Sequence, residues 1–373
     1  MIFLASFLNK CLILLLVSGL LLPGGVQAEE IRKKESPVSP GRMRLAILPV
    51  ENLSGSMAPL KEIRETFADE LRARGVDVLE EEDLQKVMVR HRIRYTGGID
   101  REVARAFKEA KTDAVLILSL ELYSEANPPK VSLLSRLVST DDPPTILWAE
   151  GAGVAGDDSP GILGLGLIED PNKLLLKGTK FVFDSLARFL SVQKGGSALE
   201  VKRKFRPRVV YQSPVFDPNR KYSVAVIPFF NRSGRRYAGE IMVLHFIREL
   251  GRFGNFHLIE PGVIRQVFLE FRIIMEDGVS LSQADVLFGA LNADLILSGR
   301  VIEYEDYQGT YGKPKVEFSA QLVERKSREI VWSSNSYNTG DDRVFFFDRG
   351  RVNTAHVMAS QMTRLIGERM TRR

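Results

Sequence analysis

The feature that most constrains this fold is a phrase that the sequence contains twice. The segment LAILPVENLSG occupies residues 45–55, and VAVIPFFNRSG occupies residues 224–234. In both, an apolar run ends in a proline and a polar turn follows, which is typical of a buried strand that leaves a sheet. Equal positions hold the same residue in the pairs Pro49 and Pro228, Asn52 and Asn231, Ser54 and Ser233, and Gly55 and Gly234.

The correspondence continues along the chain. TDAVLILSLELY at 112–123 matches ADLILSGRVIEY at 293–304, and ILWAEGAGVAGDD at 146–158 matches IVWSSNSYNTGDD at 330–342. The spacing between the copies drifts by only a few residues, as expected for small differences in loop length. Self-similarity of this kind indicates a duplicated structural unit.

Composition agrees with two globular domains. The 373 residues exceed the usual size of one domain, so each copy is long enough to bury its own core. Hydrophobic residues make up 44% and charged residues 27% of the chain, which is ordinary for a globular protein. The net charge of +5 falls short of the concentrated basic surface of a nucleic-acid binder. We therefore expect no nucleic-acid partner.

The first 28 residues have the pattern of a secretory signal. Lys10 precedes the apolar run 12–22, and small residues end the segment at Ala28. The apolar run is too short to span a bilayer alone, which predicts export and cleavage after Ala28. An uncleaved anchor is the alternative, because the apolar stretch also extends backwards from Lys10.

Cysteine usage fits an exported chain without cofactors. Cys11 is the only cysteine and lies inside the signal segment. The residues before it, 8–10, lack the small residue of a lipobox, so no lipid attachment is expected. Cleavage would leave no cysteine, which excludes disulfides, thiol chemistry and cysteine metal sites. The predicted location is the periplasm, with or without association with the outer membrane.

Each copy has the pattern of a mixed α/β domain. Early strands are joined through helices and should be parallel, whereas the last strands form a hairpin and should be antiparallel. The first copy predicts strands at 45–50, 76–79, 114–122, 131–140 and 145–151, and helices from Pro59 to Gly75 and at 82–92, 100–111 and 173–191. The second predicts strands at 223–229, 255–259, 294–303, 315–325 and 329–336, and helices at 237–250, 262–272, 281–291 and 352–369.

The fold class is therefore α/β, with two tandem copies of a mixed parallel and antiparallel sheet packed with helices. The helix at 237–250 is apolar nearly all round, which predicts packing on two sides. The expected organisation is a signal peptide at 1–28, a polar tether at 29–42, a first domain at 43–191, a basic linker at 192–221 and a second domain at 222–373.

At these motifs the chain resembles the CsgG-type and TolB amino-terminal-type family of bacterial envelope proteins. The resemblance rests on a strand-ending proline with an Asn-x-x-Gly turn, an A-D-x-x-x-x-G strand and a strand ending in I-V-W-S. The second copy carries these as Pro228, Asn231, Gly234, Ala293, Asp294, Gly299 and 330–333. The first copy departs from the pattern, since Ser119-Leu120 stands where Ser298-Gly299 would be.

The resemblance covers most of the chain outside the signal and linkers. It implies a periplasmic or outer-membrane-associated protein that binds and assembles other envelope proteins without chemistry. The lead hypothesis is an assembly or accessory scaffold. The alternative is a subunit of an oligomeric secretion channel, although no segments of about 10 alternating residues suggest inserted hairpins. Homo-oligomers and contact with a membrane surface both stay open.

Sequence patterns that could indicate a catalytic or cofactor site are explained here by local structure, without a ligand or a reaction. GAGVAG at 151–156 satisfies G-x-G-x-x-G, but two aspartates follow and the second copy keeps only Gly340. The pairs Asp157-Asp158 and Asp341-Asp342 are typical of turns and caps. The four histidines, His91, His245, His257 and His356, occupy unmatched positions in the two copies. We therefore expect no catalytic residue, cofactor or metal site.

Two kinds of contact site are candidates. The turn of the second copy carries Arg232, Arg235 and Arg236 before a helix, where an anion could bind, although a solvated loop explains the same residues. Apolar clusters follow each GDD turn, where exposed residues would mark a partner or membrane contact. The alternative is that each cluster folds over its own core or into a seam between domains. Their members are Ile162, Leu163, Leu165, Leu167 and Ile168 in the first copy, and Phe345, Phe346 and Phe347 in the second.

Overall fold

The computed structural model describes residues 43–159, 166–192, 205–274, 280–307, 309, 312–344 and 350–372. The predicted signal peptide and tether lie outside these residues. The described residues form two mixed sheets and eight helices, which confirms the predicted fold class. Among them, none of the helices has the length and apolar character needed to cross a bilayer.

The first copy forms a module that we define as residues 43–192. Its sheet has the strand order β3-β1-β4-β5-β6, and β2 pairs with β4 beside β1. Its elements are β1 (Arg44–Ile47), β2 (Glu51–Asn52), α1 (Leu60–Ala73), β3 (Asp77–Val78), α2 (Glu81–Arg90), α3 (Arg101–Glu109), β4 (Ala114–Ser124), β5 (Lys130–Ser139), β6 (Ile146–Ala155) and α4 (Pro171–Val192).

The second copy forms a module that we define as residues 205–372. Its sheet has the order β10-β8-β11-β12-β13-β7, and β9 pairs with β11. Its elements are β7 (Val209–Gln212), β8 (Tyr222–Val226), β9 (Phe230–Asn231), α5 (Ala238–Leu250), β10 (Phe256–Leu258), α6 (Pro261–Glu270), α7 (Leu281–Leu291), β11 (Leu295–Glu305), β12 (Lys315–Glu324), β13 (Ile330–Thr339) and α8 (Ala355–Met370).

The predicted strand directions are confirmed in both sheets. In the first, β1 pairs in parallel with β3 and β4, whereas the pairs β4–β5 and β5–β6 are antiparallel. The second sheet repeats this pattern with β8, β10 and β11, followed by β12 and β13. Three strands were not predicted: β2 and β9, which have two residues each, and β7, which lies in the expected linker and pairs with β13.

Local sequence sets the helix starts. Asp100 accepts the amide of Val103 at 2.8 Å and caps α3, and Thr354 caps α8 through the amide of Val357. Ser280 and Gln283 form a reciprocal capping box at α7. Such caps satisfy amides that have no partner within the helix.

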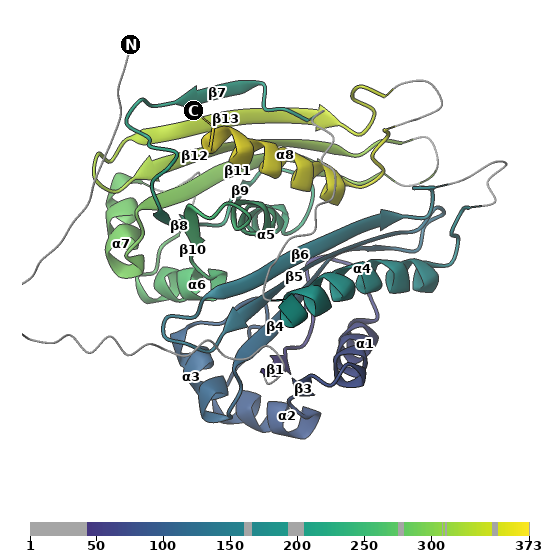
Figure 1. Cartoon of the computed structure of the whole chain (residues 1–373). Coiled ribbons are helices and arrows are strands. Elements are labelled where there is room, and N and C mark those ends of the chain that lie inside the picture. Colours follow the sequence, from purple (N-terminus) through teal and green to yellow (C-terminus); the bar gives the residue numbers. More distant parts are fainter. Residues whose placement is uncertain are drawn as a thin grey trace, which may run out of the picture. The chain divides into compact units, whose positions relative to one another are not determined.

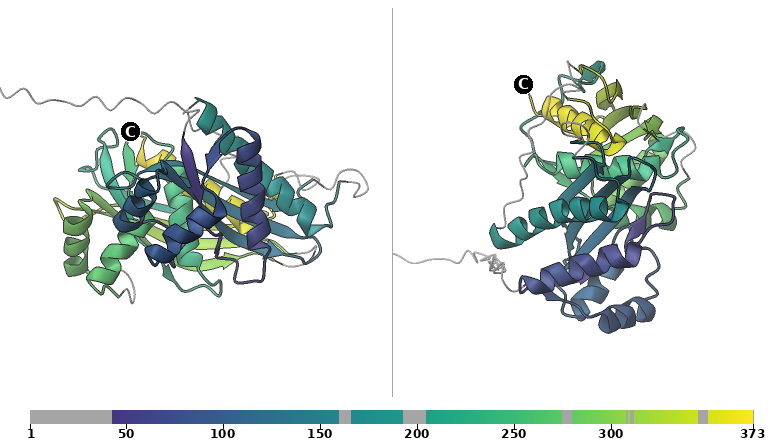
Figure 2. Two further views of the ribbon diagram at one scale, coloured as in Figure 1. Left: turned by 90° about the horizontal axis from the view of Figure 1, so that it is seen from below. Right: turned by 90° about the vertical axis from the view of Figure 1, so that its right-hand side faces the viewer.

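The two modules stack through helices of the second. Figure 1 shows α5 and α8 between the strands of the two sheets, and in Figure 2, right, α8 and α1 lie on opposite sides of the first sheet. All of α5 except Glu240 is buried, so the prediction that this helix packs on two sides is confirmed. The core of the second module also includes Leu53 and Leu134 of the first. Both modules therefore belong to one compact unit, Val38–Arg373.

Candidate functional site

Four polar side chains meet where the first and second modules are in contact, a region that we call the seam. Glu121 comes from β4, His245 from α5, Tyr304 from β11 and His356 from α8. Glu121 accepts the Tyr304 hydroxyl at 2.5 Å, and its Oε2 lies 2.6 Å from His356 Nδ1. His245 Nε2 lies 3.2 Å from the Tyr304 hydroxyl. The side chains of Glu121, His245 and His356 are at most 2% exposed, so the cluster is sealed from solvent.

Burial and the neighbouring side chains shift the pKa values of the residues in this cluster. Burial alone would raise the pKa of Glu121, but the two imidazoles outweigh burial and hold its pKa well below the usual value. Burial lowers the pKa of His245, which Glu121 partly offsets. Burial and the neighbouring Glu121 raise the pKa of Tyr304 well above its usual value. Glu121 is therefore ionised, and its oxygens accept hydrogen bonds from the neighbouring side chains.

The same residues have the composition of a metal site. One nitrogen from each of His245 and His356 and one oxygen of Glu121 lie within 4.8 Å of one another. These atoms and the Tyr304 hydroxyl already serve one another as hydrogen-bond partners, so an ion is not needed to satisfy them. His356 Nε2 is buried and has no hydrogen-bond partner. That the chain binds no metal stays a prediction.

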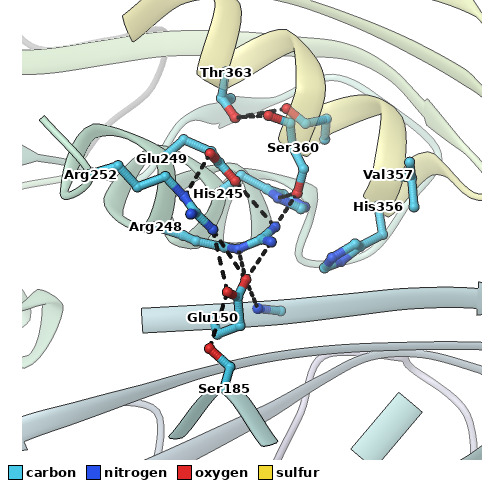
Figure 3. Close-up of polar contacts among 12 residues, drawn as sticks. Glu150, Ser185, His245, Arg248, Glu249, Arg252, His356, Val357, Ser360 and Thr363 are labelled. Carbon is cyan, nitrogen blue, oxygen red and sulfur yellow. Dashed lines mark hydrogen bonds and ion pairs between the residues drawn. The ribbon is translucent and has the colours of Figure 1, made fainter. Parts of the chain in front are cut away.

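A second buried cluster surrounds Glu150 of β6 (Figure 3). Arg248 donates to its Oε1 at 2.8 Å through Nε, and Arg252 reaches the same oxygen at 3.3 Å. Ser185 of α4 donates to Oε2 at 3.3 Å. Burial raises the pKa of Glu150, but the two guanidinium groups outweigh burial and lower the pKa below its usual value. This cluster ties β6 and α4 of the first module to α5 of the second.

A third buried pair joins Arg136 of β5 to Glu260, which precedes α6. Two hydrogen bonds of 3.0 and 2.9 Å connect the guanidinium with the carboxylate. Their side chains are 3% and 0% exposed. The three clusters use ionisable groups to hold the modules together.

The glycines of GAGVAG have a packing role. A Cβ at Gly153 would lie 2.9 Å from His356 Cβ, and one at Gly151 would lie 3.0 Å from His356 Cε1. Small residues on β6 thus let α8 of the second module approach the strand. The following Asp158 accepts the Ala155 amide at 2.8 Å, and Asp342 accepts the Thr339 amide at 3.0 Å. Both aspartates close turns, as predicted.

The predicted contact residues are dispersed. Arg232 and Arg236 are exposed and lie over Phe230 and Tyr237, respectively. Arg235 instead donates to the main-chain oxygen of Glu121 at the seam. Anion binding by this loop stays a prediction.

Two members of the predicted apolar clusters, Leu167 and Ile168, lie within the described residues. Leu167 is 36% exposed, and Ile168 is partly buried against the first core. A partner or membrane contact at these positions stays a prediction. The members that lie outside the described residues are Ile162, Leu163, Leu165, Phe345, Phe346 and Phe347.

The seam clusters were missed for an identifiable reason. Residues that recur at equal positions in the two copies are those with the same contacts inside each module. Glu121, His245 and His356 have unlike counterparts because they meet across the modules rather than within each one. Only the run of charged and polar residues in apolar surroundings, such as Glu121 within LSLELY, hinted at a buried partner.

No family model and no curated protein matches the sequence. Similar solved structures include the PelC dodecamer from Paraburkholderia phytofirmans, with 18% identity over 44% of this chain and 96% of that chain and a TM-score of 0.31. Lipoprotein GNA1162 from Neisseria meningitidis has 16% identity over 39% of this chain and 96% of its own, with a TM-score of 0.29. The LpoB C-terminal domain from Escherichia coli has 18% identity over 31% and 82%, with a TM-score of 0.24. Each similarity spans less than half of this chain.

Proposed function

We propose that this is an exported cell-envelope protein that acts without chemistry, as an assembly or accessory scaffold that holds partner proteins. The observation that carries the proposal is a set of three exposed apolar side chains at and just after the end of α6, which we call the α6 patch. Leu269, Phe271 and Ile274 are 61%, 53% and 73% exposed and lie within six positions of one another. Contiguous exposed apolar surface is typical of protein contacts, and we propose that these three side chains form such a surface.

The first module lacks this patch. By the repeat, α2 corresponds to α6, and the positions that match Leu269, Phe271 and Ile274 hold Val89, His91 and Arg94. Val89 is 75% exposed, but the other two matched positions hold polar or charged residues. The patch is therefore a property of the second module and not of the shared fold.

The buried ionisable residues between the two modules also support the proposal. His245, His356 and the Glu121 and Glu260 carboxylates are buried in contacts between modules. A sealed cluster of this kind rigidifies a two-module body, and rigidity favours the positioning of partners.

The test is the native mass of complexes extracted gently from envelopes, measured by light scattering after size exclusion. We expect the wild type to elute with a partner, and Leu269→Ser with Phe271→Ser to elute alone with unchanged thermal stability. Val89→Ser is the matched control and should keep the partner. Complexes that survive the double substitution would contradict a contact at α6. A discrete high-order ring that requires detergent would favour the secretion channel instead.

A further inference from the structure

A separate cavity of about 300 Å³ lies where the two copies of the repeated phrase approach each other. Glu51 and Leu53 from the first phrase line it, together with Val226 and Pro228 from the second. Its size is at the lower end of the range for small-molecule sites. Neither the seam clusters nor the α6 patch uses it.

The cavity contains a carboxylate that the protein only half satisfies. Ser119 donates to Glu51 Oε2 at 2.7 Å, and no hydrogen bond from the described residues reaches Oε1. That oxygen lies against Gly97, where any Cβ would collide with it. Burial raises the pKa of Glu51, and the nearby Glu240, which also lines the cavity, adds to this effect. Arg136 lowers the pKa of Glu51 in part, but its hydrogen bonds go to Glu260 and to the main-chain oxygen of Gly97.

Aromatic rings complete the lining. Tyr95, Tyr237 and Phe268 contribute to the wall. The guanidinium of Arg265 lies 4.4 Å from the centre of the Tyr95 ring, and that of Arg236 lies 4.9 Å from the centre of the Tyr237 ring. Tyr237 has a left-handed backbone with φ of 61°. That conformation is costly for an aromatic residue and is found where surrounding structure imposes it, often at ligand sites.

We propose that this cavity binds a small organic cation, an alkylammonium group, between the Glu51 and Glu240 carboxylates and the aromatic wall. A cation would give Glu51 Oε1 the partner that it lacks and would lie against ring faces, which attract positive charge. The lining itself carries two carboxylates and one guanidinium, that of Arg265, and the nearby Arg136 is already paired with Glu260. This inference goes beyond the proposed scaffold function and does not depend on it.

The test is calorimetric titration of the purified full-length mature chain with choline and with n-butylammonium. Each has a neutral counterpart of similar shape, 3,3-dimethylbutan-1-ol and butan-1-ol. We expect saturable binding of a cation at least about tenfold tighter than binding of its neutral counterpart. Tighter binding of choline would indicate a free quaternary ammonium, and tighter binding of n-butylammonium a lysine-like primary ammonium.

Variants locate the binding. Glu51→Gln keeps the acceptor for Ser119 but removes the charge, and should weaken cation binding by about tenfold or more. Glu240→Gln, at an exposed helix position, gives a second test that leaves the core intact. Glu62→Gln in the first turn of α1 is the matched control and should bind as the wild type does. Equal binding of cation and neutral counterpart, or unchanged binding by a folded Glu51→Gln variant, would overturn the proposal.

Discussion

The strands β5 and β12 occupy the same place in the two sheets, but their matching faces lie in opposite surroundings. On β5 this face is at most 3% exposed, because helices of the second module cover it. On β12 burial alternates along the strand, so the same face is only partly covered. The matched side chains are Lys130 and Lys315, Ser132 and Glu317, Leu134 and Ser319, and Arg136 and Gln321.

The difference shows how a stack of repeats ends. One sheet face of the first module receives α5 and α8, whereas the equivalent face of β12 carries the polar side chains of Lys315, Glu317, Ser319 and Gln321, which are only partly buried. A polar outer face is how terminal repeats stay soluble. The second module thus covers the first and closes the stack.

The sheet edges differ in the same way. In the second module, β7 pairs with β13 and covers its edge. In the first, β6 is the last strand, and Glu150 accepts the Gly151 amide at 3.0 Å while it binds Arg248. An exposed edge is a template for unwanted pairing. One module covers its edge with a strand, and in the other the Glu150 side chain binds one main-chain amide of the last strand.

The largest effect is expected at the buried ion pair. Arg136→Leu would leave the carboxylate of Glu260 buried without its cation and should lower the free energy of unfolding by about 3–5 kcal/mol. Gln321→Leu at the matched position on β12 should change it by less than about 0.5 kcal/mol. Urea unfolding of both variants measures the contrast. Equal effects would show that the two faces are not in different surroundings.

A smaller loss is expected for an apolar contact on the same face. Leu134→Ala should cost about 2–5 kcal/mol, because it opens a cavity between β5 and the second module. Ser319→Ala at the matched position should be nearly neutral. Thermal unfolding of each variant against the wild type gives the comparison. A neutral Leu134→Ala would mean that the modules separate easily in solution.

The pH dependence of stability should differ between Asp306 and its counterpart Glu125. Burial raises the pKa of Asp306 from 3.8 to about 6, whereas Glu125 is exposed. Between about pH 4 and 6 the unfolded chain ionises this carboxyl while the folded protein keeps it protonated, so stability falls as pH rises, by about 1–3 kcal/mol.

Asp306→Asn removes the ionisation but keeps an acceptor for the Ala355 amide, which lies 2.8 Å from the Asp306 carboxylate. The variant should lose the fall in stability between pH 4 and 6 in denaturant titrations. Glu125→Gln should retain it. An unchanged profile in Asp306→Asn would assign the fall to other groups.

The smallest effect is expected from metal removal. Because Glu121 already accepts the Tyr304 hydroxyl and lies 2.6 Å from His356 Nδ1, a chelator should leave the melting temperature unchanged. Elemental analysis of the purified protein should find no stoichiometric metal. One tightly bound equivalent whose removal lowers the melting temperature would make the seam a metal centre.

Much of the fold follows from patterns within each copy. The long strands β4, β5, β11 and β12 have clear apolar runs or alternation, and the helices have caps and apolar faces that sequence periodicity reveals. The two-residue strands β2 and β9 are too short for any periodicity. β7 lies in a basic segment and is a strand because β13 offers it an edge.

By itself, the sequence determined the duplication, the α/β class and the direction of the main strands, since these depend on residues close together in each copy. Only the tertiary structure decided what covers each sheet, because burial of β5 comes from helices more than 90 positions later in the chain. For the same reason the sequence alone did not join Glu121 to His356, Arg136 to Glu260 or Glu51 to its cavity. Contacts between unlike residues of two modules leave no periodic signal, and three-dimensional packing alone brings them together.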